Sequence, residues 1–226
     1  MLDYYEEKLS AERLRHVYRI ASPRVRQYLE AEIEHVLGFV RSGDSVLELG
    51  CGYGRVLPAL ARKAARVVGI DTSLASLQMG RGQFRAGHNI DLVCANAVRL
   101  SFGDGSFDVV VCIQNGISAF HVDPLELMRE AIRVTGPGGT VLFSTYSDRF
   151  WGERLRWFER QSEEGLLGEI DRDKTGNGVI VCRDGFTATT VDRHQFRQWA
   201  TDLGVEVSLA EVDSSSLFCE IAIPLS

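Results

Sequence analysis

The stretch Val46-Leu47-Glu48-Leu49-Gly50-Cys51-Gly52-Tyr53-Gly54-Arg55 decides how the rest of the chain is interpreted. Its first four residues predict a buried strand, three glycines follow at alternate positions, and the apolar pattern over residues 56–61 predicts a helix. This order is typical of the first unit of a nucleotide-binding α/β sheet. Glycine accepts positive φ angles and, without a Cβ atom, lets backbone amides approach a ligand closely. The turn alone does not say which ligand, so the rest of the chain has to decide.

The composition predicts one soluble α/β domain with a sizeable core. The chain has 226 residues, of which 45% are hydrophobic and 25% are charged. The net charge of −6 argues against a nucleic-acid partner held by bulk electrostatics. No apolar run approaches the length of a membrane span, and the acidic, aromatic start is unlike a signal peptide. We therefore expect no membrane partner. The five cysteines form no CxxC pair, so we expect reduced thiols in a cytoplasmic protein.

Apolar patterns predict an alternation of strands and helices. The strand patterns occupy residues 46–49, 66–71, 90–95, 107–113 and 140–146, followed by a hairpin over 205–212 and 217–223. The main helical patterns occupy residues 10–21, 23–40, 56–61, 124–134 and 192–203, and another follows residue 73. The strand at 107–113 is almost entirely apolar, as expected for a central parallel strand. We expect a doubly wound α/β fold with a mostly parallel seven-stranded sheet, an antiparallel C-terminal strand and helices on both faces.

Two parts of the chain stand outside this alternation. We expect residues 1–41 to form an N-terminal helical lid and residues 42–226 to form the main domain. Residues 147–191 are rich in aromatic and charged side chains and interrupt the main domain as an insertion.

Five arginines occur between residues 13 and 26 without an intervening acid. A solvated helix face is the favoured interpretation, and contact of one arginine with an acidic substrate is the alternative.

Asp71 ends the second strand about twenty residues beyond the glycines, at the spacing typical of an acid that binds ribose hydroxyls. The alternative is a helix N-cap, because Asp71-Thr72-Ser73 precedes a helical pattern. The two roles are compatible, and the spacing favours the ribose.

Four motifs in one order now carry a family resemblance. They are Glu48 before Gly50, Gly52 and Gly54; Asp71; Asn96; and the turn Gly136-Pro137-Gly138-Gly139. Together they resemble the class I S-adenosylmethionine-dependent methyltransferases of the methyltransferase domain 11/25 type that act on small molecules. The resemblance is strong over residues 44–146 and rests on the order of elements over residues 192–224. A nicotinamide oxidoreductase fits worse, because its usual G-x-G-x-x-G spacing differs from glycines at 50, 52 and 54.

The resemblance implies S-adenosylmethionine as cofactor, S-adenosylhomocysteine as product, and a set of cofactor contacts. The backbone of the glycine turn, Cys51 included, would lie against the amino-acid tail and the sugar, while Glu48 would hold the amino group or brace the turn. Arg55 would reach the carboxylate, or else form a surface ion pair. Asn96 stands where the family commonly has Asp and would contact the adenine amine. The remaining contacts implied are Asp71 for the ribose, Thr72 and Ser73 beside the adenine, the amide of Ala97 or Val98 at a ring nitrogen, and Gln114 and Asn115 beneath the methionine portion.

The sequence says less about the methyl acceptor than about the cofactor. Transfer from a sulfonium is an in-line displacement, so the protein mainly positions the acceptor and excludes water, and a base is needed only if the acceptor loses a proton. We expect the acceptor between the loop 114–121, the segment 146–191 and the N-terminal helices. His121 is the candidate base and Tyr146 the candidate orienting group; packing roles are the alternatives. The acceptor-side candidates are Tyr18, Arg19, Asn115, Ser118, His121, Tyr146, Arg149 and Trp151, and Tyr4 and Tyr5 with Tyr18 are candidates to cover the cofactor.

Two classes of function remain open at this point. The first is a methyltransferase acting on the nitrogen or oxygen of a small molecule, which an aromatic lid over a closed pocket would suit. The second is a methyltransferase-fold protein that binds the cofactor and acts on or with a protein partner. The absence of a His/Cys cluster argues against a metal. We expect a monomer or a homodimer.

Overall fold

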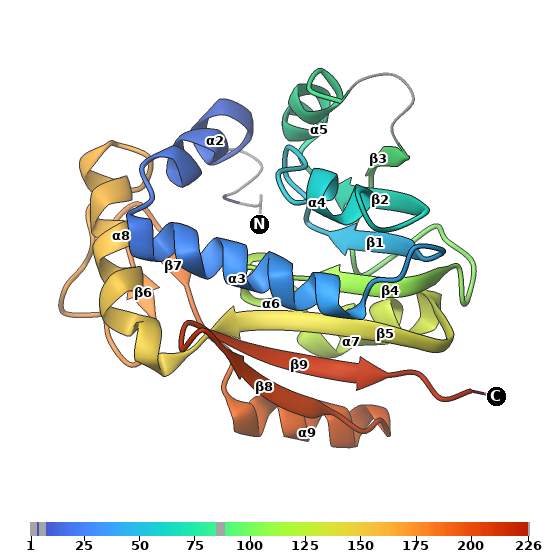
Figure 1. Cartoon of the computed structure of the whole chain (residues 1–226). Helices are drawn as coiled ribbons and strands as arrows, with labels where there is room; N and C mark the ends of the chain where they lie inside the picture. The colour runs from blue at the N-terminus through green and yellow to red at the C-terminus, as the bar shows by residue number, and fades with distance from the viewer. Residues whose placement is uncertain (1–3, 5–7, 85–88, 226) are drawn as a thin grey trace.

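The computed structural model describes residues 4, 8–84 and 89–225, and within them a seven-stranded sheet forms the centre of the protein (Figure 1). The strands follow the order β3-β2-β1-β4-β5-β9-β8. Their bounds are β1 Ser45–Leu49, β2 Arg66–Asp71, β3 Ile90–Cys94, β4 Phe107–Cys112, β5 Thr135–Tyr146, β8 Ser208–Val212 and β9 Ser216–Ala222. The first five are parallel, and β9 is antiparallel to both β5 and β8. The predicted fold is therefore confirmed.

Helices cover both faces of the sheet. The helices α3 (Pro23–Phe39), α4 (Leu57–Ala61) and α5 (Leu74–Arg81) pack on one face, and α7 (Pro124–Val134) and α9 (Arg193–Leu203) pack on the other. Each longer helix begins at a local signal. Ser22 accepts a hydrogen bond from Val25 N ahead of Pro23, and Asp192 forms a reciprocal capping box with Gln195.

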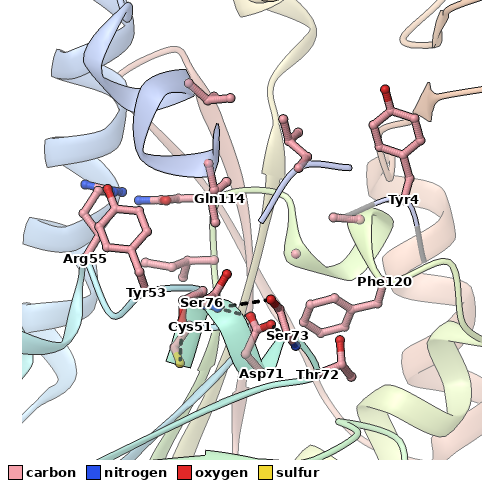
Figure 2. Close-up of a pocket in the computed structure, with 18 of the residues that line it drawn as sticks. Tyr4, Cys51, Tyr53, Arg55, Asp71, Thr72, Ser73, Ser76, Gln114 and Phe120 are labelled. Atoms are coloured by element: carbon pink, nitrogen blue, oxygen red, sulfur yellow. Dashed lines mark hydrogen bonds between the residues drawn. The ribbon is translucent and has the colours of Figure 1, made fainter. Parts of the chain in front are cut away.

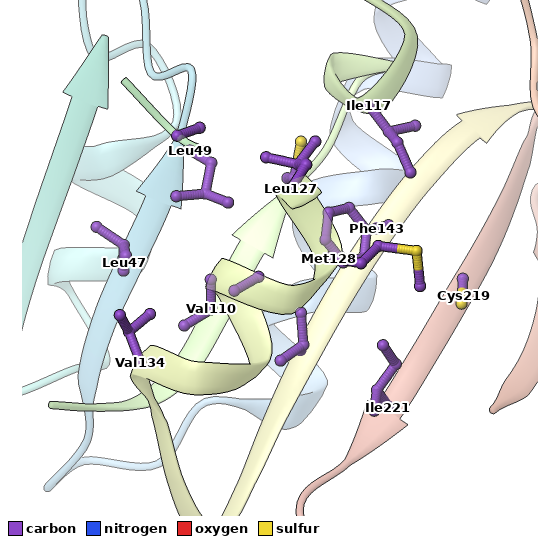
Figure 3. Close-up of a cluster of buried hydrophobic side chains, with 14 of the residues drawn as sticks. Leu47, Leu49, Val110, Ile117, Leu127, Met128, Val134, Phe143, Cys219 and Ile221 are labelled. Atoms are coloured by element: carbon purple, nitrogen blue, oxygen red, sulfur yellow. The ribbon is translucent and has the colours of Figure 1, made fainter. Parts of the chain in front are cut away.

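The core under α7 shows why these strands are so apolar. Leu47 and Leu49 of β1, Val110 of β4 and Phe143 of β5 point to one face and meet Met128 of α7 (Figure 3). All five side chains are at most 2% exposed. Burying about a hundred square ångströms of apolar surface contributes roughly 2.5 kcal/mol, so such layers hold the strand ends in place.

One strand begins earlier than the sequence indicates. The glycine–proline turn at residues 136–139 is part of β5, because Thr135 already pairs with Phe107 of β4. The register then shifts, and regular pairing resumes at Thr140 with Val109. A Cβ atom on Gly139 would lie 2.5 Å from the carbonyl oxygen of Asp108, so the irregularity depends on close backbone contact.

The N-terminal helices and the insertion form a second layer at the carboxyl ends of the parallel strands (Figure 1). The helix α2 (Ala11–Arg19) lies near α8 (Trp151–Glu163), which follows the short η1 turn (Asp148–Phe150). The strands β6 (Ile180–Val181) and β7 (Thr187–Ala188) pair antiparallel beside them. Trp157 Nε1 donates to the Val17 carbonyl at 3.2 Å, which ties α8 to α2. A separate apolar core joins the two segments, although their sequences lie more than a hundred residues apart.

The helix α3 belongs to both layers. Its first half contributes Val25, Tyr28 and Leu29 to the second core, and its second half contributes Val36 to the core beneath the sheet. No helix among residues 4, 8–84 and 89–225 combines the length and apolarity needed to cross a membrane.

Candidate active site

A cavity of about 960 Å³ lies between the sheet and this second layer. It opens above the carboxyl ends of β1, β2 and β4, where ligands of open α/β sheets generally bind. Figure 2 shows Arg55, Tyr53 and Gln114 gathered at one side and Asp71, Ser73 and Phe120 at the other. The volume is at the upper end of the range for small-molecule sites, about 300–1,000 Å³. The cavity can therefore hold a nucleoside-sized cofactor together with a second small molecule.

The glycine turn after β1 forms the floor of the cavity. Gly50, Gly52 and Gly54 have φ angles of +74°, +56° and +80°. L-residues rarely adopt this region, so the alternate glycines are required by the path of the chain. A Cβ atom on Gly50 would collide with the Phe120 ring, and one on Gly52 would lie 2.9 Å from Leu14 Cδ2. The backbone is therefore bare on the side that faces the cavity, while Gly54 itself lies outside the lining.

Asp71 links the glycine turn to the start of α5. One carboxylate oxygen accepts from Gly52 N at 2.8 Å, and the other accepts from Ser73 N at 2.8 Å. The N-cap of α5 is Ser73, whose hydroxyl accepts from Ser76 N at 3.2 Å. The N-cap interpretation of Asp71 is therefore wrong, while the carboxylate does line the cavity at the end of β2.

Glu48 is a buried carboxyl group that faces the cavity. Its side chain lines the cavity, and its Oε2 atom has no hydrogen-bond partner among the described residues. Burial raises the pKa of Glu48 to about 8; the charge of Arg55 opposes this shift and that of Asp71 adds to it. A buried carboxyl without a partner is costly, so this position favours a cationic or hydrogen-bond-donating group from a ligand.

Buried donors lie on the same side of the cavity. The Arg55 guanidinium stacks 4.4 Å over the Tyr18 ring, and its Nε and Nη2 atoms are buried without a hydrogen-bond partner among the described residues. The same is true of Gln114 Nε2, and Figure 2 shows the Gln114 side chain directed toward Arg55. Such donors require oxygen atoms of a ligand or water. An acid and two donors together suit the ammonium and carboxylate of an amino acid.

The loop after β4 is held in a strained conformation. Gln114 and Asn115 have φ angles of +59° and +65°, in the left-handed region. Gln114 N donates to Glu32 Oε2 at 2.7 Å and to Ser144 Oγ at 2.8 Å. The Asn115 side chain accepts from Thr145 Oγ1 at 2.8 Å and donates to the Thr189 carbonyl at 3.0 Å. Asn115 thus braces the loop from outside the cavity, and Gln114 faces into it.

Glu32 of α3 is a buried acid that sequence reasoning missed. Besides Gln114 N, it accepts from Ser144 Oγ at 2.9 Å and from Ser216 Oγ at 2.6 Å. Burial raises the pKa of Glu32 to about 7 against the effect of these hydrogen bonds. The available signal was an acid inside the apolar stripe that Leu29, Ile33 and Val36 form on this helix.

The residues expected to contact the adenine lie at the other side of the cavity. Thr72, Ser73, Asn96 and Ala97 line it, and so does Cys51 of the turn. Val98 does not, because its amide donates to Asn96 Oδ1 at 3.0 Å within a local turn. The carbonyl of Asn96 is therefore already used by its own loop.

The acceptor candidates divide into two groups. Tyr18, His121 and Tyr146 line the cavity, whereas Arg19, Asn115, Ser118, Arg149 and Trp151 do not. Arg149 is an exposed side chain paired with Glu211 at 3.6 Å. Arg19 contacts His16 on the surface of α2, which agrees with the solvated-face interpretation of the basic stretch.

Several lining residues were not foreseen as contacts. They are chiefly Tyr28, Tyr53, Phe120, Trp157, Phe158 and Phe186, with Gln161 beside them. At the mouth, the Tyr4 hydroxyl donates to Asp184 at 2.6 Å, whereas Tyr5 lies outside the described residues. For Tyr28 and for the residues of the insertion the sequence signal was the aromatic content of these two segments, whereas Tyr53 lies in the glycine turn and Phe120 in the loop 114–121. No group of three or more His, Cys, Asp or Glu side chains in the described part of the chain could hold a metal ion.

Comparison with known proteins agrees with this geometry. Residues 46–139, from β1 into β5, match a family model described as a methyltransferase domain. This match, over less than half of the 226 residues, bears out the resemblance to the class I S-adenosylmethionine-dependent methyltransferases. It covers the glycine turn, the acid at the end of β2 and the loop after β4, and the cofactor that the motifs predicted is confirmed.

Curated relatives of this chain match over part of their length. One is malonyl-[acyl-carrier protein] O-methyltransferase from Marinomonas sp. (strain MWYL1), 36% identical over 131 residues, which are 55% of this chain and 47% of the relative. Another is ubiquinone biosynthesis O-methyltransferase from Idiomarina loihiensis, 34% identical over 48% of this chain and 47% of the relative. The chain thus spans about half the length of these two relatives.

Solved structures share the whole fold. PH0226 protein from Pyrococcus horikoshii OT3 superposes with a TM-score of 0.66 at 21% identity, covering 99% of both chains. The N-methyltransferase NodS from Bradyrhizobium japonicum WM9, in complex with S-adenosylhomocysteine, superposes with a TM-score of 0.60 at 15% identity over 97% of this chain and 96% of that one. At these identities the likeness establishes the fold.

Proposed function

We propose that this chain transfers a methyl group from S-adenosylmethionine to a nitrogen or oxygen atom of a small molecule by in-line displacement. The observation that carries the proposal is one continuous cavity. It begins at the glycine turn and Asp71 and continues to the aromatic side chains of the second layer. The enclosure favours a small acceptor over the surface of a protein partner, which is the alternative. A cytoplasmic location and a monomeric or homodimeric state stay predictions.

The buried polar atoms match the groups of this cofactor. Asp71 would accept from the ribose hydroxyls, and Asn96 and the amide of Ala97 would face the adenine. Glu48 would accept from the ammonium group, and the unpartnered donors of Arg55 and Gln114 would bind the carboxylate. The bound sulfonium supplies an electrophilic methyl group. Each of these residues lines the cavity, which supports the assignment.

On the acceptor side the chain has to orient a nucleophile and exclude water. The acceptor's lone pair forms the bond to the methyl carbon as the carbon–sulfur bond breaks, and the bonding electrons stay with sulfur. An acceptor that carries a proton must also release it. We assign this proton to His121 and the orientation of the acceptor to Tyr146, because both line the cavity.

Binding of S-adenosylhomocysteine tests the proposal directly. A ligand that binds the folded state raises the melting temperature, by about 2.7 kcal/mol of stabilisation at a hundred times its Kd. We expect a clear shift at millimolar ligand and a much smaller one in Asp71→Ala. Gly43→Ala is the matched control, because Gly43 has open space around it and lies far from the turn. No shift in the wild type, or an equal shift in Asp71→Ala, would refute the assignment.

A further inference from the structure

A glutamine lies beside aromatic side chains on the buried face of α8. This face consists of Arg154, Trp157, Phe158 and Gln161, which recur at helical spacing, and the last three line the cavity. Trp157 Nε1 is already engaged, because it donates to the Val17 carbonyl at 3.2 Å. Of the three lining residues, Gln161 is therefore the one whose side chain can offer hydrogen bonds to a molecule in the cavity.

The side chain of Gln161 is buried without a partner. The residue is 2% exposed, and its amide forms no hydrogen bond with residues 4, 8–84 and 89–225. A carboxamide carries two N–H donors and one acceptor oxygen, and burying these groups unpaired is costly. Native proteins pair nearly all such groups with protein, water or ligand. The position of this amide at the cavity wall therefore favours a ligand as its partner.

The backbone that carries Gln161 is held in place. Its carbonyl accepts from Leu166 N at 2.9 Å, and Gly165 ends the helix with a φ of +67°. Arg13 of α2 donates to the carbonyls of Gly165 at 2.8 Å and Leu166 at 3.0 Å. The amide thus extends into the cavity from a fixed helix end, and a rigid support of this kind favours specific recognition.

The residues proposed to bind the cofactor lie elsewhere. Asp71 and Gln114 lie at the carboxyl edge of the sheet, whereas α8 belongs to the second layer. This layer lines the cavity mainly with apolar side chains such as those of Leu9 and Trp157. A molecule that contacts Gln161 therefore packs against apolar surface and meets a polar group at one point.

We infer that Gln161 binds the methyl acceptor, and that this acceptor has an apolar body with a carbonyl, carboxamide or hydroxyl group besides the atom that receives the methyl group. The inference rests on the proposed function, because it names the substrate class of the same site. The amide N–H groups would donate to an oxygen of the acceptor, and the amide oxygen would accept from its N–H or O–H. A compound without such a group would leave the buried amide unpaired and bind less well.

The stability of the ligand-free protein separates an amide that binds a ligand from one that supports the fold. Gln161→Met keeps the length of the side chain and removes its polar atoms. Because an unpaired buried amide is lost, the melting temperature should rise by about 2–4 °C. Gln78→Met on α5 is the matched control, because Gln78 is exposed and outside the cavity, and it should shift the melting temperature by no more than about 1 °C. A lower melting temperature or loss of folding in both Gln161→Met and Gln161→Leu would overturn the inference.

Two probes of similar shape measure the polar contact. The protein is saturated with S-adenosylhomocysteine and titrated with benzamide or with α-methylstyrene, which has an isopropenyl group in place of the carboxamide, and binding is followed by ligand-observed NMR. Gln161→Met should weaken benzamide at least about fivefold and change α-methylstyrene less than about twofold, whereas Gln78→Met should change neither. An equal effect on both probes, no effect on benzamide, or no binding of benzamide to the wild type would overturn the inference.

The affinity for S-adenosylhomocysteine separates this inference from the proposed function. It should agree within about twofold between the wild type and Gln161→Met, because the two sites are independent. Failure of S-adenosylhomocysteine to bind the wild type would refute the proposed function. Weaker binding in Gln161→Met alone would assign the amide to the cofactor and refute only this inference.

Discussion

Glu48 makes binding of the cofactor product depend on pH. In the ligand-free protein, burial raises the pKa of this carboxyl to about 8, so about nine tenths of it is protonated at pH 7. The ammonium group of S-adenosylhomocysteine favours the ionised form. Binding at pH 7 should therefore release nearly one proton, and affinity should rise with pH as more of the free protein becomes ionised.

The size of the effect follows from the ionised fraction. With a pKa of about 8, this fraction grows from about 1% at pH 6 to about 50% at pH 8. Affinity should then increase about 50-fold over this range, or roughly 2.3 kcal/mol. Glu48→Gln resembles the protonated carboxyl, so its affinity should match the wild type within a few-fold at pH 6 and stay flat to pH 8.

Titration calorimetry measures the affinity for S-adenosylhomocysteine at each pH. Repeating it in phosphate and in Tris gives the number of protons released, because the two buffers differ in ionisation enthalpy. Asp71→Asn is the control: it should weaken binding at every pH and retain the slope, since the slope belongs to Glu48. A wild-type affinity that is constant between pH 6 and 8, without proton release, would show that Glu48 does not meet the ammonium group. A slope that survives in Glu48→Gln would assign the pH dependence to another group.

Three further predictions concern stability, the glycine turn and turnover. The free energy of unfolding of the ligand-free protein should fall as the pH rises from about 5 to 8. In the folded protein the pKa values of Glu48 and Glu32 are raised to about 8 and about 7, so these groups retain protons that the unfolded chain has released. Urea titrations should show a shallower fall in Glu48→Gln. Gly50→Ala should weaken S-adenosylhomocysteine at least tenfold by calorimetry, since its φ of +74° and the Phe120 ring oppose a Cβ atom, while Gly43→Ala should change it less than twofold. His121→Ala or Tyr146→Phe should lower kcat with an acceptor more than the affinity for S-adenosylhomocysteine, and unchanged turnover in both would disprove their assigned roles.

The cofactor side could be predicted from the sequence because it is built locally. The glycine turn, Asp71 and Asn96 each lie at or just beyond the carboxyl end of a strand, and parallel strands bring these ends to one edge. Asn115 shows the limit of this reasoning. It follows Gln114 immediately, yet the left-handed backbone at both residues sends one side chain into the cavity and the other into a brace between Thr145 and Thr189.

The sequence did not predict the roles of charged side chains whose partners lie on distant elements. Arg149 looked suited to a carboxylate substrate, but β8 presents Glu211 beside it, and the two form an exposed ion pair. Glu32 is an acid of the helix α3, and Ser144 and Ser216 on the strands beneath that helix make it a buried acceptor. Neither partner follows from the local pattern, because each lies more than sixty positions away.

Arg154 shows why the acceptor side of the cavity could not be predicted from the sequence. On α8 alone, an arginine among Glu153, Arg156 and Glu159 is typical of a solvated helix face. It is fully buried because the segment from Gly178 to Ala188 folds over α8 and supplies carbonyl oxygens to its guanidinium. Tyr146, at the end of β5, then packs against a fixed positive charge instead of solvent. The surroundings of the acceptor side thus arise from three segments that meet only in the folded protein, whereas each motif of the cofactor side is already visible in one strand and the residues that follow it.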